Sequence, residues 1–216
     1  MKETLDLILE NKLIMIVRGI PNEQLIDLAE SMWRGGIRLM EITYDASGNI
    51  PDEQTAQGIA DLAKHFEGRM TIGAGTVLKE SQITLTKEAG GKFIISPDTN
   101  VQIIEQTKKQ GLVSIPGALT PSEAGAASRA GADLVKLFPI GQMGPSYLKA
   151  LCAPLSHIRF LAVGGVRSAN MAEYLHSGAS GFGIGLTAQE RDEARDGVYD
   201  ALVARCKEMT AILKQH

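Results

Sequence analysis

A single lysine, Lys136, lies in the middle of a short apolar run at residues 132–139. The length of this run and the proline that ends it are typical of a buried β-strand. Alternate residues of a strand face the same way, so Lys136 shares a face with Leu134. If that face is buried, the low dielectric lowers the pKa of the amine. A neutral lysine amine is a nucleophile that forms a Schiff base with a ketone.

A carboxylate that could serve this lysine lies on an earlier apolar run, residues 37–43. Glu41 shares strand parity with Leu39, so it faces a core if Leu39 does. A buried carboxylate can move protons during imine formation, or it can form a structural ion pair with Lys136. Because buried ion pairs are often no more stabilising than apolar packing, we favour the catalytic interpretation. Only a bound carbonyl compound distinguishes the two.

Two late turns are rich in glycine, one containing Gly164 and Gly165 and the other Gly183 and Gly185. Glycine lets backbone N–H groups approach an anion, and the start of the following helix attracts negative charge. Either turn alone is weak evidence because tight turns need glycine in any case. Together they favour a phosphate-bearing ligand. Arg18, which follows the first apolar run, could bind that phosphate or a carboxylate.

The elements that must position these residues alternate regularly along the chain. Apolar runs begin near residues 13, 37, 70, 93, 112, 134, 158 and 181, and a helical pattern follows each. Eight such units predict an α/β protein with a (β/α)8 TIM barrel, a single domain over residues 1–216 with an N-terminal helix at Lys2–Asn11. An open doubly wound sheet is the alternative. We expect the fifth strand to end before Pro116 and the tail, residues 194–214, to be one long helix.

Composition excludes several other classes of protein. The chain has 216 residues and a formal net charge of −3, which argues against a broad nucleic-acid interface. No apolar run approaches the roughly 18 residues of a membrane span. The two cysteines and four histidines show no metal-binding spacing, so we expect neither a zinc site nor a disulfide framework. These features predict a cytoplasmic protein.

Several short motifs then occur in order along nearly the whole chain: Glu41-Ile42-Thr43, Gly73-Ala74-Gly75-Thr76-Val77, Ile95-Ser96-Pro97, Ile115-Pro116-Gly117, Val135-Lys136-Leu137-Phe138-Pro139 and the Gly164-Gly165 turn. Together they resemble the 2-keto-3-deoxy-6-phosphogluconate/4-hydroxy-2-oxoglutarate (KDPG/KHG) aldolases. That resemblance implies a class I aldolase on a (β/α)8 barrel, with no metal and no cofactor, and typically a homotrimer.

The resemblance also implies roles for individual residues. Lys136 would form the Schiff base, and Glu41 would be the general acid/base. The implied substrate-binding residues are Arg18, Thr76 and Pro97 around the pyruvate portion, Phe138 beside the lysine, Gly164, Gly165, Gly183 and Gly185 around the phosphate, and Thr43 at the end of its strand.

The implied reaction cleaves a 2-keto-3-deoxy sugar acid to pyruvate and an aldehyde, either glyceraldehyde 3-phosphate or glyoxylate. Three alternatives stay open. The first is an aldolase for the phosphogalactonate epimer or another keto-deoxy acid. The second is a phosphate-binding barrel isomerase or synthase that uses Glu41 as a base without covalent lysine chemistry. The third is a catalytically silent sugar-phosphate-binding protein.

Four positions depart from the family pattern. Asp45 stands where some members have arginine, and Val163 stands where threonine is usual. Leu186 replaces a serine, and Ile140 replaces a small residue. These changes leave the lysine chemistry in place, but they bear on which aldehyde is the natural one.

Overall fold

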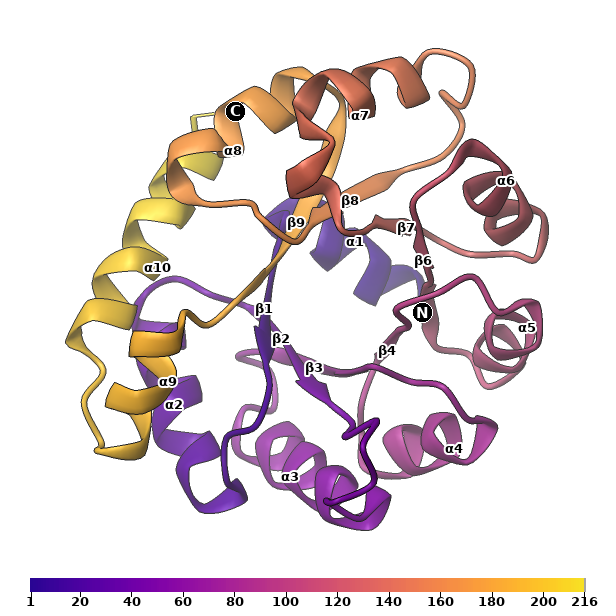
Figure 1. Ribbon diagram of the computed structural model, residues 1–216. Helices are drawn as coiled ribbons and strands as arrows, with labels where there is room; N and C mark the ends of the chain where they lie inside the picture. The colour runs from indigo at the N-terminus through magenta and orange to yellow at the C-terminus, as the bar shows by residue number, and fades with distance from the viewer. Residues whose placement is uncertain (216) are drawn as a thin grey trace.

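The computed structural model describes residues 1–215 and is a parallel barrel surrounded by helices, seen approximately along the barrel axis in Figure 1. The strands of these residues are β1 (Leu13–Val17), β2 (Leu39–Thr43), β3 (Thr71–Gly75), β4 (Phe93–Ile95), β5 (Val113–Ile115), β6 (Gly117–Ala118), β7 (Val135–Leu137), β8 (Phe160–Val163) and β9 (Ala179–Gly185). The helices are α1 (Lys2–Asn11), α2 (Asn22–Arg34), α3 (Asp52–His65), α4 (Glu80–Glu88), α5 (Val101–Lys109), α6 (Pro121–Arg129), α7 (Gly144–Cys152), α8 (Ser168–His176), α9 (Ala188–Arg195), α10 (Asp200–Leu213) and the 3-10 turn η1 (Ile140–Gln142).

The sheet closes on itself through one short segment of chain. Its strand order is β5-β4-β3-β2-β1-β9-β8-β7-β6, so β5 and β6 are its two ends. Only Pro116 separates these two strands. β5 pairs with β4, and β6 pairs with β7. The two short strands therefore occupy one strand position of the barrel and join the two ends of the sheet. The nine described strands thus fill eight strand positions around the barrel, which confirms the predicted (β/α)8 barrel.

Side chains alternate between the barrel interior and the layer beneath the helices. The interior cluster contains, among others, Ile14, Leu39, Phe93, Val113, Leu134 and Leu161. Their neighbours along each strand belong to the larger outer cluster, for example Met15, Met40, Val135 and Ala162. Lys136 has the parity of Leu134, and Glu41 has that of Leu39. Both side chains therefore face the barrel interior, as the two-residue period predicts.

Helix α1 covers the end of the barrel at which the strands begin. Ile8 is fully buried in the interior cluster, and Leu5 and Leu9 pack against it. Figure 1 shows α1 crossing the ring of strands rather than lying outside it. The predicted helix over Lys2–Asn11 is thus confirmed. With this end covered, the loops that follow the strands form the accessible mouth of the barrel.

One predicted element, the single long helix of the tail, is wrong. The tail is two helices, α9 and α10, because Gly197 lies between them with φ +72°, a left-handed conformation that ends a helix. The fifth strand ends at Ile115, before Pro116, as expected, but pairing resumes at Gly117 in the short strand β6, which was not predicted. A Cβ atom on Gly117 would lie 2.3 Å from the Pro97 carbonyl oxygen, so the absence of a side chain allows this close approach.

None of the helices described over residues 1–215 has the length and apolar character that a membrane span requires.

Candidate active site

Lys136 and Glu41 face each other across the barrel. In the closed ring of eight strand positions, three positions separate β2 from β7 on either side, so the two side chains project from opposite walls. Lys136 is 7% exposed and Glu41 is 1% exposed. Among residues 1–215 they form no direct ion pair with each other. The interior therefore holds an amine and a carboxylate that are close enough to interact electrostatically without neutralising each other by contact.

Burial dominates the protonation of both groups. Desolvation lowers the pKa of Lys136; the Glu41 charge opposes this shift, and the Arg18 charge adds to it. Desolvation likewise raises the pKa of Glu41, and the charges of Lys136 and Arg18 oppose it. Both shifts favour the neutral forms. A lysine with a lowered pKa is available as a nucleophile, and a carboxyl group with a raised pKa can act as a proton donor.

Glu41 owes its position to a glycine on the neighbouring strand. A Cβ atom on Gly75 would lie 1.5 Å from Glu41 Oε1, so the carboxylate occupies the space that a side chain would fill. The other oxygen, Oε2, is buried and accepts no hydrogen bond from residues 1–215. A buried, unpartnered carboxylate oxygen is costly, and such groups call for a functional explanation.

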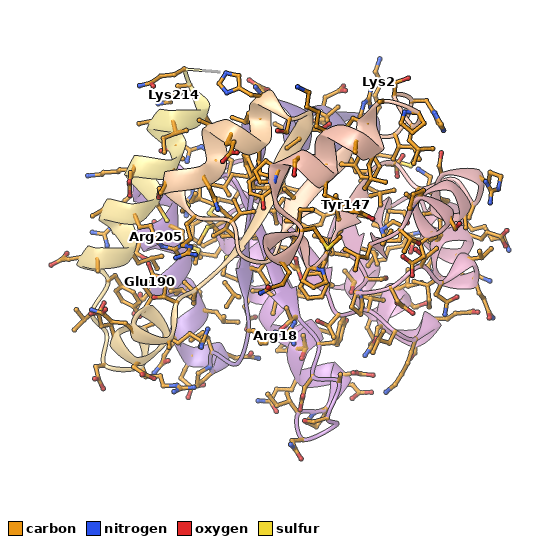
Figure 2. All side chains as sticks on the ribbon, turned by 45° about the horizontal axis from the view of Figure 1, so that its top comes forward. Lys2, Arg18, Tyr147, Glu190, Arg205 and Lys214 are labelled. Atoms are coloured by element: carbon orange, nitrogen blue, oxygen red, sulfur yellow. The ribbon has the colours of Figure 1, made fainter. Side chains whose placement is uncertain are left out.

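Beside the pair, Arg18 and Thr76 are joined at the barrel mouth. Arg18 follows β1, and its Nη2 donates to Thr76 Oγ1 at 2.9 Å. Thr76 follows β3 and has φ +55°, which is rare for a β-branched residue. Arg18 itself is exposed. In Figure 2 it lies at the end of the molecule opposite to Lys2 and Lys214, which agrees with its place after β1.

A second group of predicted residues gathers around Phe138, directly after β7. The Phe138 ring centroid is 4.8 Å from Lys136 Nζ, and the ring also packs against Gly164. Gly164 and Gly165 both have positive φ, and the Gly164 carbonyl accepts the Gly141 N–H at 2.7 Å. The predicted contact of Phe138 with the lysine is therefore present, and the first glycine turn lies beside it.

The remaining predicted residues lie at strand ends on the same face. Gly183 pairs with Val163 in register, and Gly185 pairs with Ile16. A Cβ on Gly183 would be 2.9 Å from the Val163 side chain, so this glycine also makes room inside the barrel. Thr43 is buried at the end of β2. Pro97, after β4, is half-buried.

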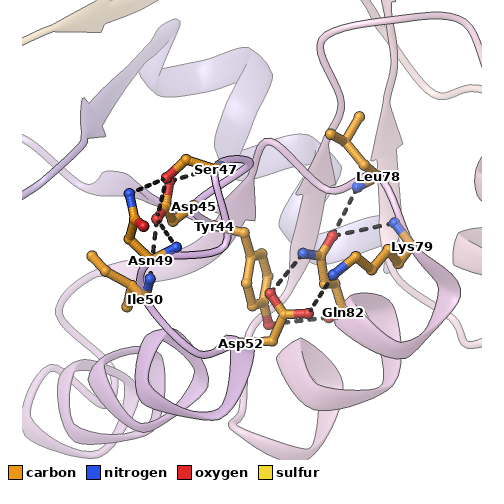
Figure 3. A network of polar contacts seen from close by, with 9 residues as sticks. All are labelled: Tyr44, Asp45, Ser47, Asn49, Ile50, Asp52, Leu78, Lys79 and Gln82. Carbon is orange, nitrogen blue, oxygen red and sulfur yellow. Dashed lines mark hydrogen bonds and ion pairs between the residues drawn. The ribbon is translucent and has the colours of Figure 1, made fainter.

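Asp45 does not present a free negative charge to this face. Its carboxylate accepts hydrogen bonds from the backbone N–H groups of Ser47, Asn49 and Ile50 at 2.9–3.0 Å and from Ser47 Oγ at 2.7 Å (Figure 3). The hydrogen bonds from Ser47 are the main reason why its pKa is lowered. In this protein the residue shapes the loop between β2 and α3.

The second glycine-rich segment is not a turn, since Gly183 and Gly185 belong to β9, and a partly buried ion pair fixes the residues that follow this strand. Glu190 accepts hydrogen bonds from Arg205 Nε and Nη2, each at 2.6 Å, and from the Thr187 N–H at 2.8 Å. Arg205 Nη2 also donates to the Gly185 carbonyl at 3.2 Å. Figure 2 shows Glu190 and Arg205 side by side. Through these contacts α10 holds the segment that joins β9 to α9.

Sequence reasoning did not identify the positions that create space or hold loops. Gly141 packs against the Gly164-Gly165 turn, and Gly75 accommodates Glu41. Gln82 holds the loop after β3. A capping-box signature could have identified Gln82, but it requires Ser or Thr three residues earlier, where this chain has Lys79.

A cavity also lies away from this site. It has a volume of about 830 Å³ and is lined by residues of α1 and of the segments entering β3 and β4, including Asn11, Arg38 and Lys92. These residues belong to the end of the barrel that α1 covers. The proposed catalytic residues and this cavity are thus at opposite ends of the barrel.

A closed parallel barrel with a desolvated lysine opposite a carboxylate has the architecture of a class I aldolase, which is a lyase. The family model "KDPG and KHG aldolase" matches residues 5–204, and the chain belongs to this family. It is 35% identical over 174 residues to the 2-dehydro-3-deoxy-6-phosphogalactonate aldolase of Escherichia coli, covering 80% of this chain and 82% of that protein.

Two further similarities agree with this assignment. The chain is 32% identical over 154 residues to the 2-dehydro-3-deoxy-phosphogluconate aldolase of Treponema pallidum, covering 71% of this chain and 70% of that protein. A solved structure described as native KDPGal superposes with a TM-score of 0.81 at 29% identity, over 94% of each chain. The resemblance inferred from the motifs is therefore confirmed, as is the assignment to the aldolases.

Proposed function

We propose that this aldolase cleaves a 2-keto-3-deoxy-6-phospho sugar acid to pyruvate and glyceraldehyde 3-phosphate, and 4-hydroxy-2-oxoglutarate to pyruvate and glyoxylate. The observation that carries the proposal is the desolvated amine of Lys136 opposite the buried carboxyl group of Glu41. A ketone that enters from the mouth can react with the amine while the carboxyl group exchanges protons with the substrate.

The steps follow from these two groups. Lys136 Nζ attacks the C2 carbonyl, and the carbinolamine loses water to give an iminium ion. Glu41, as carboxylate, takes the proton of the C4 hydroxyl while the C3–C4 bond breaks. The aldehyde leaves, and the bonding electrons form an enamine on C3. Glu41 returns the proton to C3, and water hydrolyses the iminium to pyruvate and the free amine.

The mouth supplies binding groups for the charged ends of such a substrate. We assign the substrate carboxylate to Arg18 and Thr76, since a guanidinium and a hydroxyl there can both donate hydrogen bonds. Gly164, Gly165, Gly183 and Gly185 frame the proposed phosphate site beside the starts of α8 and α9. Thr43, Pro97 and Phe138 complete the wall around the lysine. The reaction uses no metal and no cofactor.

The phosphogalactonate epimer is the second candidate substrate. The 35% identity to an aldolase named for that compound favours it. The two sugar acids differ only in configuration, so the residues proposed for imine formation and phosphate binding serve both.

Trapping of the imine tests this proposal. Incubation with pyruvate and borohydride should add the mass of reduced pyruvate to Lys136, and peptide mapping should locate it there. Cleavage assays with the phosphogluconate-derived, phosphogalactonate-derived and four-carbon substrates would then rank the substrates. Absence of an adduct at Lys136, or full activity of Lys136→Arg, would contradict the mechanism.

We further propose a homotrimer in the cytoplasm. Exposed apolar side chains that follow three adjacent strands support self-association: Ile50 in the loop after β2, Leu78 in the loop after β3 and Val101 at the start of α5, after β4. Sedimentation of the intact protein measures the number of subunits. Both cysteines are free thiols, which suits a reducing compartment.

A further inference from the structure

Thr76 is held in an unfavourable backbone conformation at the barrel mouth. A threonine at φ +55° is a steric outlier, because its branched side chain crowds the backbone there. Such strain persists only where the surrounding structure imposes it, and it is concentrated at functional sites. The contacts on either side of Thr76 must therefore impose this conformation.

Hydrogen bonds fix the chain on both sides of Thr76. Before it, the Gly75 carbonyl accepts the Tyr44 N–H at 2.8 Å. After it, one side-chain oxygen, Gln82 Oε1, accepts the N–H groups of Leu78 at 2.8 Å and Lys79 at 3.2 Å (Figure 3). Between these contacts the Val77 N–H donates to the Ile95 carbonyl at 3.3 Å, so Gln82 fixes the two residues that come directly after Val77.

Gln82 is itself held rigidly. It is 3% exposed, and its Nε2 donates to Asp52 Oδ1 at 2.8 Å. Its backbone carbonyl accepts the hydroxyl groups of Tyr44 at 3.2 Å and Thr86 at 2.7 Å. Asp52 is the first residue of α3, so Gln82 ties the loop after β3 to the helix that follows β2. Every polar group of its side chain has a partner, and such satisfied networks are rigid.

We propose that Gln82 is a positioning residue for catalysis: it holds Thr76 in its left-handed conformation, and Thr76 Oγ1 in turn holds the Arg18 guanidinium where the carboxylate of a 2-keto acid binds. The connection runs from Gln82 through Leu78 and Lys79 to Thr76. This inference rests on the proposed role of Arg18 and Thr76 in carboxylate binding. Gln82 does not touch the substrate.

The test compares two ketones in the borohydride trapping of Lys136. Pyruvate needs the carboxylate site, whereas acetone has no carboxylate. In Gln82→Met, which has a similar shape but no hydrogen-bonding groups, we expect the pyruvate concentration for half-maximal trapping to rise about tenfold. Trapping by acetone should change less than twofold. A general loss of structure would instead affect both ketones alike.

Two further variants separate positioning from folding. Thr107→Val in α5 removes a buried hydroxyl that donates to the Ile103 carbonyl at 2.7 Å, outside this network, and should leave both ketones unaffected. Gln82→Glu keeps the acceptor for the loop but places a second carboxylate against Asp52. Combining it with Asp52→Asn exchanges donor and acceptor and should restore pyruvate trapping to within about threefold of the original protein.

The outcomes are distinct. If the unaltered protein gives no pyruvate adduct at Lys136, the proposed function fails. If it gives the adduct and Gln82→Met matches it for both ketones, or loses both equally, the positioning role is overturned. Failure of the Gln82→Glu and Asp52→Asn pair to recover pyruvate trapping while remaining folded, as judged by circular dichroism, also overturns it.

Discussion

The carboxylate of Glu41 lies against the α-carbon of Gly75, in the space that the side chain of any other residue would occupy. Gly75 is on β3 and pairs in register with Thr43 of β2, the strand that carries Glu41. The position of the proposed acid/base thus depends on a missing side chain on another strand.

Gly75→Ala should displace the Glu41 carboxylate, because the new Cβ would lie 1.5 Å from Oε1. We expect kcat for cleavage to fall by about 10²-fold, which is within the usual contribution of general acid–base catalysis. Gly125→Ala is the matched control, since a Cβ there meets only the flexible Arg129 side chain at 3.1 Å. If Gly75→Ala retains full kcat, Glu41 does not act from its present position.

The pH dependence of pyruvate trapping should report the charges around Lys136. Trapping requires the neutral amine, so its initial rate should rise with pH through the lowered pKa of Lys136. The Glu41 charge raises this pKa and the Arg18 charge lowers it. Glu41→Gln should therefore move the midpoint to lower pH, and Arg18→Met should move it to higher pH. Shifts in the same direction would contradict this account of the site.

Much of the barrel could be predicted because it depends on local patterns. The alternation of side chains along each strand correctly placed Lys136 and Glu41 in the interior. The spacing of the apolar runs correctly predicted the eight strand positions of the barrel. The exchange of strand partners at Pro116 could not be predicted, because it depends on the approach of the Pro97 carbonyl. The break in the tail at Gly197 had a local signal, a glycine between two helical patterns, that the prediction of one helix did not use.

The site was less predictable where it depends on contacts between distant segments. Nothing near Gly75 in the sequence indicates that Glu41 will occupy its side-chain space. Asp45 departs from the family pattern, but its residue type does not indicate that its own loop supplies donors to both carboxylate oxygens. In each case the decisive partner is fixed by the folded backbone, not by residue type.

Lys136→Met should change how stability depends on pH. In the folded protein the pKa of Lys136 is lowered, so between that pKa and the lysine pKa of the unfolded chain the unfolded state binds the additional proton. The free energy of unfolding therefore gains up to about 1.4 kcal/mol per pH unit across this window from Lys136 alone. Lys136→Met lacks this gain. Urea unfolding at a series of pH values measures the free energy of unfolding of both proteins. The value for Lys136→Met minus the value for the original protein should decrease as pH rises. A constant difference would mean that the pKa of Lys136 is not lowered.

The ion pair between Arg205 and Glu190 should contribute to the free energy of unfolding. Arg205→Met leaves the Glu190 carboxylate buried without its cation, which should cost about 3 kcal/mol. Adding Glu190→Gln removes the unpaired charge while an amide oxygen can still accept the Thr187 N–H, so the double variant should be more stable than Arg205→Met alone. Urea unfolding measures both values, and strictly additive costs would show that the two side chains do not interact.

The same variants test the proposed phosphate site, because Arg205 holds the carbonyl of Gly185, the last residue of β9, where the turn to α9 begins. Loosening this turn should raise KM for the phosphorylated substrate by about tenfold. The KM for 4-hydroxy-2-oxoglutarate, which has no phosphate, should change less than twofold, since the lysine and the carboxylate site lie on other strands. Equal effects on both substrates would indicate that the turn supports the barrel as a whole and that the phosphate binds elsewhere.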